Sequence, residues 1–446
     1  MKNSFSPLSV VLIAISLLIG SLSAKDETPP PVPIPIDPII QRDSLWETSA
    51  ADLEPEWKPL GFEWTSAAQR SARNARPGLT FRDRPLNEVL LAFQDGKFAE
   101  ATLIYFNRGD AGQINENSFE TLLSAITADL TTLTGQSPAE RGRDTSSAVK
   151  AQGRIWEVND TEYLLEWSTT KASRTKGIPW RGEFIRLTIR PKNTTERAIG
   201  EMTPQNASRA AVKSFTGADH VEKRANGTLV LTGLPMVDQG QKGYCVVASA
   251  ERVLRYYGVE VDQHELAQIA NSDASKGTSP SAMFDSLKQL TSRFGIKSRA
   301  LVEWEYNDFL KMISKYNRAT KRGKLAPEID TNLRDIDSFY APMNPEILKE
   351  VRLKQKADFG RFQRDIQSHI EKGIPLLWSV RLGLIPEKEI PQAVGGHMRL
   401  VIGFDAASGE ILYSDSWGSG HEEKRMSLED AWTITSSLSA LQPAGS

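Results

Sequence analysis

A lone cysteine, Cys245, stands at the start of a predicted helix and is the residue best suited to nucleophilic chemistry. Apolar residues follow it at the 3.6-residue spacing of an amphipathic helix until Gly258, where the pattern stops. The dipole and the unsatisfied N–H groups of a helix N-terminus favour the thiolate, which is the attacking form of cysteine. Six residues earlier, Gln239 carries an amide that can donate to a developing oxyanion together with the Cys245 N–H. These residues predict attack on a carbonyl carbon.

A cysteine nucleophile needs a base within hydrogen-bond reach, and the base needs a third group to orient it. His397 is the best candidate base, because it follows two glycines and opens an apolar run typical of a strand. Asp415 comes directly after the next strand-like run. A hairpin of these two strands brings Asp415 beside His397, as a triad requires.

The other histidines among the five in the chain fit the role of base less well. We expect His220 to lie in a connector, His264 to be solvated at a helix start and His369 to be packed on a helix face. His421 is expected in a glycine-flanked loop, a position that can line a cleft.

Each of these features alone has a simpler explanation. A single buried cysteine often behaves as a small hydrophobic residue, and a lone Asp-Ser-Trp-Gly is usually a turn. The order Gln239, Cys245, His397 and Asp415, each in a suitable local setting, favours a reactive site over coincidence.

Two segments resemble those of papain-like cysteine peptidases. Gln239-Gly240-x-x-Gly243-x-Cys245 is similar to their oxyanion-glutamine and nucleophile segment, and Asp415-Ser416-Trp417-Gly418 to their Asn-Ser-Trp-Gly segment. The Cys-to-His separation of 152 positions is close to the roughly 130–150 of such enzymes. The aspartate, and the Gly-His before an apolar strand, most resemble the double-glycine leader peptidases that process bacteriocins. The resemblance covers residues 231–435, about half of the chain.

The resemblance implies a papain-like α+β fold with a helical half led by Cys245 and a β half that carries His397 and Asp415. It also implies acyl transfer: Cys245 attacks a peptide or amide carbonyl, Gln239 stabilises the oxyanion, His397 moves the proton and Asp415 orients the imidazole. No cofactor and no metal are expected, because the sequence has no clustered His/Cys ligands and no phosphate-binding glycine loop.

The sequence departs from the papain-type pattern at two places. The additional cysteine that those enzymes have shortly before the nucleophile is absent, with Tyr244 directly before Cys245, and a charged, helical segment at 303–360 has no counterpart in them.

Length and hydrophobic patterning predict two domains. Residues 44–195 are expected to form a smaller α+β domain of unknown role, and residues 231–446 the papain-like domain, joined by a connector at 196–230. The first domain should contain strands at Phe98–Phe106, around Gly153–Trp167 and at Glu183–Arg190, and a helix at Glu116–Thr134. The second should contain strands at Leu376–Val380, Met398–Phe404 and Glu410–Tyr413.

The N-terminus predicts export. Residues 1–24 have the weakly basic start, apolar run and small residues of a signal peptide, although a retained anchor is the alternative. Residues 25–43 are rich in proline and are expected to form an unstructured tether. A secreted or periplasmic location follows, without stable membrane insertion after cleavage. The formal net charge of −2 argues against a nucleic-acid partner.

Several functional alternatives remain open at this point. The main hypothesis is a secreted cysteine peptidase acting on a peptide or protein substrate. A papain-fold amidase or acyltransferase, or a binding protein without turnover, would have the same motifs. The domain at 44–195 is interpreted either as an inhibitory prodomain or as a permanent module that recruits substrate. The sequence does not indicate an oligomeric state.

Overall fold

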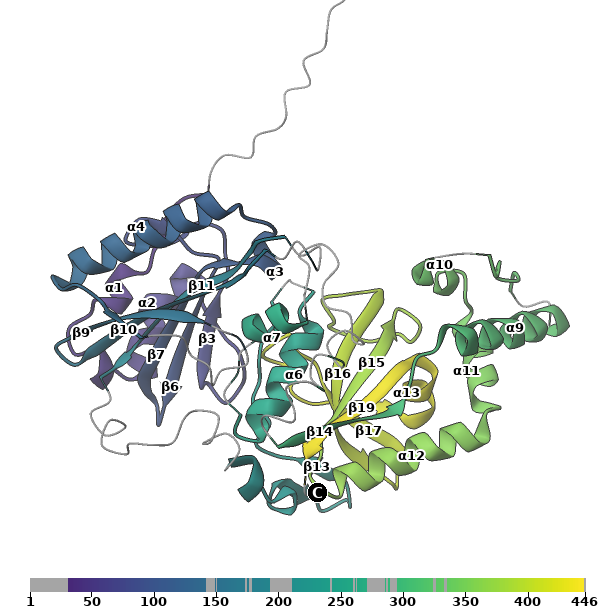
Figure 1. Cartoon of the computed structure of the whole chain (residues 1–446). Helices are drawn as coiled ribbons and strands as arrows, with labels where there is room; N and C mark the ends of the chain where they lie inside the picture. The colour runs from purple at the N-terminus through teal and green to yellow at the C-terminus, as the bar shows by residue number, and fades with distance from the viewer. Residues whose placement is uncertain are drawn as a thin grey trace, which may run out of the picture. The chain divides into compact units, whose positions relative to one another are not determined.

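The computed structural model describes residues 31–141, 149, 151–172, 175, 179–192, 211–240, 243–259, 261, 263–270, 285, 288, 295–323, 326–332 and 335–444 (Figure 1). The predicted signal peptide, 1–24, and the first part of the predicted connector, 196–210, lie outside the described residues. No helix among the described residues is long and apolar enough to cross a membrane. Pro33–Ser446 forms one compact unit.

The first half of this unit is built on an eight-stranded sheet of predominantly antiparallel hairpins. In sheet order its strands are β2 (Glu63–Trp64), β3 (Ser71–Asn74), β6 (Glu88–Gln94), β7 (Lys97–Asn107), β11 (Arg181–Pro191), β10 (Thr161–Thr170), β9 (Gln152–Val158) and β8 (Ala139–Glu140). A small second sheet contains β1 (Ile34–Pro35), β4 (Leu79–Phe81) and β5 (Arg84–Pro85). The short helices are α1 (Asp37–Ile40), η1 (Leu45–Glu47), α2 (Ala50–Trp57), η2 (Lys58–Leu60) and α3 (Arg108–Ala111).

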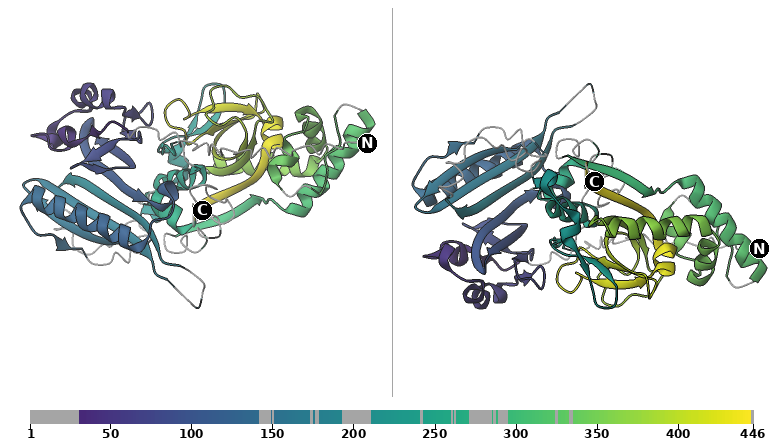
Figure 2. Two further views of the ribbon diagram at one scale, coloured as in Figure 1. Left: turned by 90° about the horizontal axis from the view of Figure 1, so that it is seen from above. Right: turned by 90° about the horizontal axis from the view of Figure 1, so that it is seen from below.

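The long helix α4 (Glu116–Thr134) lies along one face of the large sheet (Figures 1 and 2). Its bounds agree with the sequence prediction, because both ends have strong local signals. The Asn115 side chain accepts a hydrogen bond from the Ser118 N–H, and Gly135 ends the helix with φ of 66°. The buried face consists of Phe119, Leu123, Ile126 and Leu130.

The predicted tether was wrong for its second half. Within 25–43, Ile34 and Pro35 pair in parallel with Leu79 and Thr80. The next residues form α1, and three isoleucines enter the hydrophobic core of the first half: Ile36, Ile39 and Ile40. Burial of these apolar side chains, which proline content does not reveal, makes the segment part of the fold.

A second eight-stranded sheet organises the other half of the unit. Its order is β12 (Val221–Lys223), β13 (Leu229–Leu231), β16 (Gly395–Asp405), β15 (Leu376–Leu382), β19 (Thr435–Pro443) and β14 (Ile296–Val302), while β17 (Glu410–Ser414) pairs with β16 and with β18 (Lys424–Ser427). The three strands expected near 376, 398 and 410 are therefore present. Together the helices and sheets give the expected α+β class.

Helices cover both faces of this sheet (Figure 1). Alternate residues of β15 point to opposite faces: Trp378 packs in one core and Leu377 in the other. On the Leu377 side lie α6 (Cys245–Tyr256) and α7 (Gln263–Ile269). On the Trp378 side lie α9 (Tyr306–Gly323), α10 (Ile336–Tyr340), α11 (Pro345–Leu353), α12 (Lys356–Ile370) and α13 (Leu428–Ile434).

One expected boundary needs correction, and the segment without a family counterpart has a structural role. The predicted connector, 196–230, contributes β12 and most of β13 to the sheet, and Thr228 donates a hydrogen bond of 2.7 Å to Asp405. The second half therefore begins before residue 231. The helical segment 303–360 is an integral part of this half, because Phe309, Ile313 and Phe339 lie in its core.

Candidate active site

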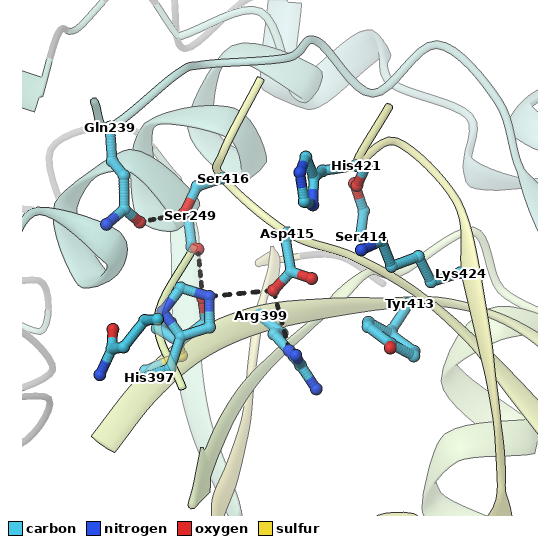
Figure 3. Close-up of polar contacts among 12 residues, drawn as sticks. Gln239, Ser249, His397, Arg399, Tyr413, Ser414, Asp415, Ser416, His421 and Lys424 are labelled. Atoms are coloured by element: carbon cyan, nitrogen blue, oxygen red, sulfur yellow. Dashed lines mark hydrogen bonds and ion pairs between the residues drawn. The ribbon is translucent and has the colours of Figure 1, made fainter. Parts of the chain in front are cut away.

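The fold brings the two predicted strand positions together. His397 lies near the start of β16, and Asp415 follows β17 directly. Antiparallel pairing of Leu400 with Ser414 brings the two ends side by side. His397 Nε2 and Asp415 Oδ1 are 2.9 Å apart (Figure 3). Both side chains are fully buried.

Cys245 is the first residue of α6 and is partly exposed, with a free thiol. Of the two nitrogens of the His397 ring, Nε2 is taken by Asp415, whereas Nδ1 has no conventional hydrogen-bond partner among the described residues. The Cys245 thiol also interacts with this imidazole. The imidazole ring of His397 therefore lies between the Asp415 carboxyl group and the Cys245 thiol, and Nδ1 is the nitrogen that can interact with the thiol.

The electrostatics favour a protonated imidazole beside the Asp415 carboxylate. Burial lowers the pKa of His397, but the hydrogen bond to Asp415 and the influence of Cys245 outweigh burial and raise the pKa above its ordinary value. Burial would raise the pKa of Asp415, but His397 and the positive charge of Arg399 lower it overall. Asp415 is therefore held as a carboxylate.

Aromatic rings enclose the pair. The Trp417 ring stacks on His397 with a centroid separation of 4.1 Å and an interplanar angle of 6°. The His421 ring meets Trp417 edge-on at 5.6 Å. The Asp415 backbone N–H donates to the His421 carbonyl at 3.0 Å, which fixes the chain on either side of Trp417. This packing fixes the plane of the imidazole and keeps bulk water from its hydrogen bond.

The amide of Gln239 is oriented by the strand end that carries Asp415. The Ser416 hydroxyl donates to Gln239 Oε1 at 2.6 Å, and the Gln239 N–H donates to the Ser416 carbonyl at 2.8 Å. Figure 3 shows Oε1 facing Ser416 and the amide nitrogen directed away from it. Because Oε1 is occupied, the amide presents its N–H groups, which suits an oxyanion donor.

A buried arginine that the sequence reasoning missed lies behind the pair. Arg399 Nε donates to Asp415 Oδ1 at 2.8 Å, and its other nitrogens contact Glu387 at 3.2 and 2.9 Å. The Tyr413 hydroxyl donates to the same glutamate at 2.6 Å. The available signal was an arginine inside the apolar run 398–404, since a buried cation requires an anionic partner.

A second missed arginine ties the cysteine helix to the aspartate. Arg252, on α6, donates to the Asp415 carbonyl at 2.8 Å and to Ser414 Oγ at 2.7 Å. Its Nε donates to the Pro235 carbonyl at 2.9 Å. Burial lowers the pKa of Arg252 to about 10, although Asp415 opposes that effect. One side chain therefore joins the two elements that carry the thiol and the carboxylate.

The remaining histidines lie apart from the His397–Asp415 contact or only flank it. His264 was expected to be solvated, which was wrong: it is 4% exposed and its Nδ1 lies 2.7 Å from Asn107 Nδ2. His369 is packed as expected, with Nδ1 2.6 Å from the Asp365 carbonyl. The described residues contain no group of three or more His, Cys, Asp or Glu side chains suited to holding a metal ion.

Comparison with known proteins identifies a family for the C-terminal half. No curated protein matches the chain. Residues 231–440 match the model of the Peptidase_C39 like family, a range that includes the cysteine helix and both strand ends of the site. The C-terminal domain of this chain is therefore a papain-like peptidase domain of the Peptidase_C39 like family.

Proposed function

We propose that this protein is a cysteine peptidase in which Cys245, His397 and Asp415 form the catalytic triad and Gln239 supplies an oxyanion donor. The observation that carries the proposal is the buried His397–Asp415 contact of 2.9 Å beside the free thiol at the N-terminus of α6. The family match supports the peptidase class.

The proposed reaction is acyl transfer in two steps. The Cys245 thiolate forms a bond to the carbonyl carbon of a peptide, and the carbonyl electrons move to oxygen, where Gln239 and the Cys245 N–H stabilise the negative charge. Protonated His397 gives its proton to the leaving amine as the C–N bond breaks. Neutral His397 then takes a proton from water, which attacks the thioester and releases the acid and the thiolate.

We further propose that the protein acts outside the cytoplasm. The signal-like sequence of residues 1–24 supports export. A free, partly exposed thiol is compatible with such a location only if it remains reduced, because oxidation removes the nucleophile.

The test combines labelling with turnover. At about pH 6 an ordinary thiol is almost entirely protonated, so we expect rapid iodoacetamide labelling of Cys245 in the wild type and slow labelling in His397→Ala. Cys245→Ala should lower peptide hydrolysis by at least about a thousandfold while the unfolding midpoint stays close to the wild-type value, and His397→Ala should lower hydrolysis as much while the protein remains folded. Hydrolysis reduced less than tenfold in Cys245→Ala would refute the assignment. A Ser368→Ala variant, which changes a side chain on α12, serves as the control.

A further inference from the structure

The first half of the compact unit contacts the residues on both sides of Gln239 and the residue before Cys245, the two proposed oxyanion donors. Asp238 and Gly240 flank Gln239, and Tyr244 precedes Cys245 as the N-cap residue of α6. Side chains from β3 and β7 reach all three of these flanking residues. The inference below rests on the proposed function of this site.

Arg73, on β3, is the contact on the Gln239 side. Its Nε donates to Glu88, and its Nη1 lies 3.7 Å from Asp238 Oδ2. The guanidinium also lies against Gly240, where a Cβ atom would come within 2.4 Å of Nη2. Gly240 has φ of 67°, so both its backbone conformation and this contact require glycine. Arg73 is 9% exposed.

Within the same turn, Asp238 is bound from both sides. Its Oδ1 accepts a hydrogen bond of 2.7 Å from the Gly240 N–H, while Oδ2 faces Arg73. The turn that holds Gln239 is therefore closed by an aspartate whose second oxygen is paired with a cation from the other half. Burial would lower the pKa of Arg73, but Glu88 and Asp238 raise it overall, so this cation is permanent.

Asn107, at the end of β7, is the contact on the Cys245 side. Its Oδ1 accepts hydrogen bonds of 2.7 Å from the Tyr244 hydroxyl and 2.8 Å from the Gly109 N–H. Its Nδ2 lies 2.7 Å from His264 Nδ1 on α7. A side chain at Gly109 would collide with the Tyr244 hydroxyl, which a Cβ would approach to 1.7 Å. Tyr244 is 1% exposed, so the residue before the nucleophile is enclosed.

We propose that Arg73 and Asn107 are positioning residues of the active site, and that the first half of the chain is a permanent part of the oxyanion hole. Arg73 fixes the turn that presents the Gln239 amide, and Asn107 fixes the residue from which α6 and its first N–H begin. An inhibitory prodomain has to separate from the enzyme, and separation here would leave Asp238 and the Tyr244 hydroxyl without these partners. This argues for the permanent module rather than the prodomain.

The central experiment uses Arg73→Met in the full-length protein. Because an oxyanion donor is worth about 10²–10³ in kcat, we expect Arg73→Met to lower kcat by about 10- to 100-fold with a smaller change in KM. Gln239→Ala sets the scale for complete loss of one donor. Iodoacetamide labelling of Cys245 should keep its wild-type rate and pH profile, since Arg73 does not touch the Cys245–His397 pair. Arg73→Lys, which keeps the charge, should recover part of the activity.

Arg186→Met is the matched control. Arg186, on β11, pairs with Glu265 on α7 at 2.8 Å, so it also joins the two halves through an ion pair, but its partner lies on α7 and not in the turn that holds Gln239. We expect kcat within about twofold of the wild type despite a comparable loss of stability. Equal losses of kcat in Arg73→Met and Arg186→Met would overturn the positioning role, because both would then act only through stability.

Hydrogen–deuterium exchange gives a readout independent of turnover. Arg73→Met should speed exchange of the Gln239 and Gly240 amides, and Tyr244→Phe that of the Ala248 amide, which donates to the Tyr244 carbonyl at 2.8 Å, while α12 stays at wild-type rates. Unchanged exchange at these amides would overturn the inference whether or not the protein is a peptidase. A wild type that exchanges as expected, labels rapidly and hydrolyses no peptide would instead overturn the proposed function alone.

Discussion

One carboxylate oxygen of Asp415 accepts hydrogen bonds from two side chains, His397 and Arg399. Oδ1 accepts from His397 Nε2 at 2.9 Å and from Arg399 Nε at 2.8 Å. Papain-type enzymes, which the domain resembles, have asparagine at this position, so an acceptor is sufficient to orient the imidazole there. The carboxylate adds a negative charge in a buried setting, where charge interactions are strong.

The charge should be visible in the pH profile of Asp415→Asn. A raised pKa keeps His397 protonated to a higher pH, so the imidazolium that the proposed mechanism requires survives further into the alkaline range. Asparagine keeps an acceptor but loses the charge, so we expect the alkaline limb of kcat/KM to move to lower pH. Measurement of kcat/KM from about pH 5 to 10 tests this. An unmoved alkaline limb would show that Asp415 only orients the ring.

At the residue scale, the predicted contact between His397 and Asp415 is present in the structure, whereas the catalytic roles of Cys245, His397 and Asp415 stay predictions. The lone cysteine, the glycine-preceded His397 and the Asp415 that follows a strand were all found from type and spacing, and the structure places the last two in contact. Arg252 was missed because its partner is 163 positions away in sequence. Arg399, whose partner is only 16 positions away, was missed because residues 398–404 were interpreted only as an apolar strand. Only the three-dimensional pairing of α6, β16 and β17 shows what each arginine binds.

At the scale of elements, α6 both presents the thiol and fixes its own position. Cys245 stands at its N-terminus, and Arg252, two turns later, reaches three acceptors outside the helix. Ser249 also lies on this buried face, with Oγ 3.5 Å from the Met398 carbonyl. The helix is thus bound to the strand that carries His397 and to the loop that carries Asp415.

Removal of the Arg252 hydrogen bonds should lower the stability of the fold. Arg252→Met leaves the Asp415 and Pro235 carbonyls and Ser414 without their buried donor, so we expect the free energy of unfolding to fall by about 3 kcal/mol or more. Urea denaturation measures the change.

Arg255→Met is the control on the same helix. Arg255 is half exposed and pairs with Glu251 at 3.1 Å in an i,i+4 arrangement, so its loss should cost less than about 1 kcal/mol. Similar losses in the two variants would show that Arg252 contributes only surface interactions.

Helices and strands whose ends have strong local sequence signals were predicted well. Strands separated only by a tight turn were not. The bounds of α4 follow from a continuous helical period with an asparagine before it and a glycine after it. The single strand expected around Gly153–Trp167 is a hairpin of β9 and β10. Apolar residues continue through both strands, and the only signal of the turn is Asn159-Asp160, where Asn159 has φ of 53°.

For the whole molecule, the contacts between the two halves were beyond prediction from sequence. They combine β3, β6 and β7 with the turn before α6 and with α7. No local sequence pattern predicts these pairings, because each of these side chains, considered alone, looks like an ordinary polar residue of the surface. Burial of His264 and Asn107 follows only from the assembled fold.

The start of the compact unit is a second place where the sequence did not predict the structure, and here the contacts are between apolar side chains. The sequence Ile34-Pro35-Ile36-Asp37-Pro38-Ile39-Ile40 was interpreted by its prolines, yet its isoleucines determine its structure. Proline restricts the unfolded chain, so this segment loses less conformational entropy when its apolar side chains are buried. Composition predicts a stiff segment, but only the presence of a nearby hydrophobic core decides whether it folds onto that core.

Ile39→Ala tests whether this segment stabilises the whole fold. Ile39 is 1% exposed and packs in the same core as Trp57 and Leu53, so the substitution leaves a cavity and should lower the free energy of unfolding by about 2–4 kcal/mol. Val32→Ala is the control, because Val32 is 80% exposed and its truncation should change stability by less than about 0.5 kcal/mol. Urea denaturation followed by tryptophan fluorescence reports on this core, which contains Trp57. Equal stability of the two variants would mean that the segment adds nothing to the fold and acts as the tether that its prolines predicted.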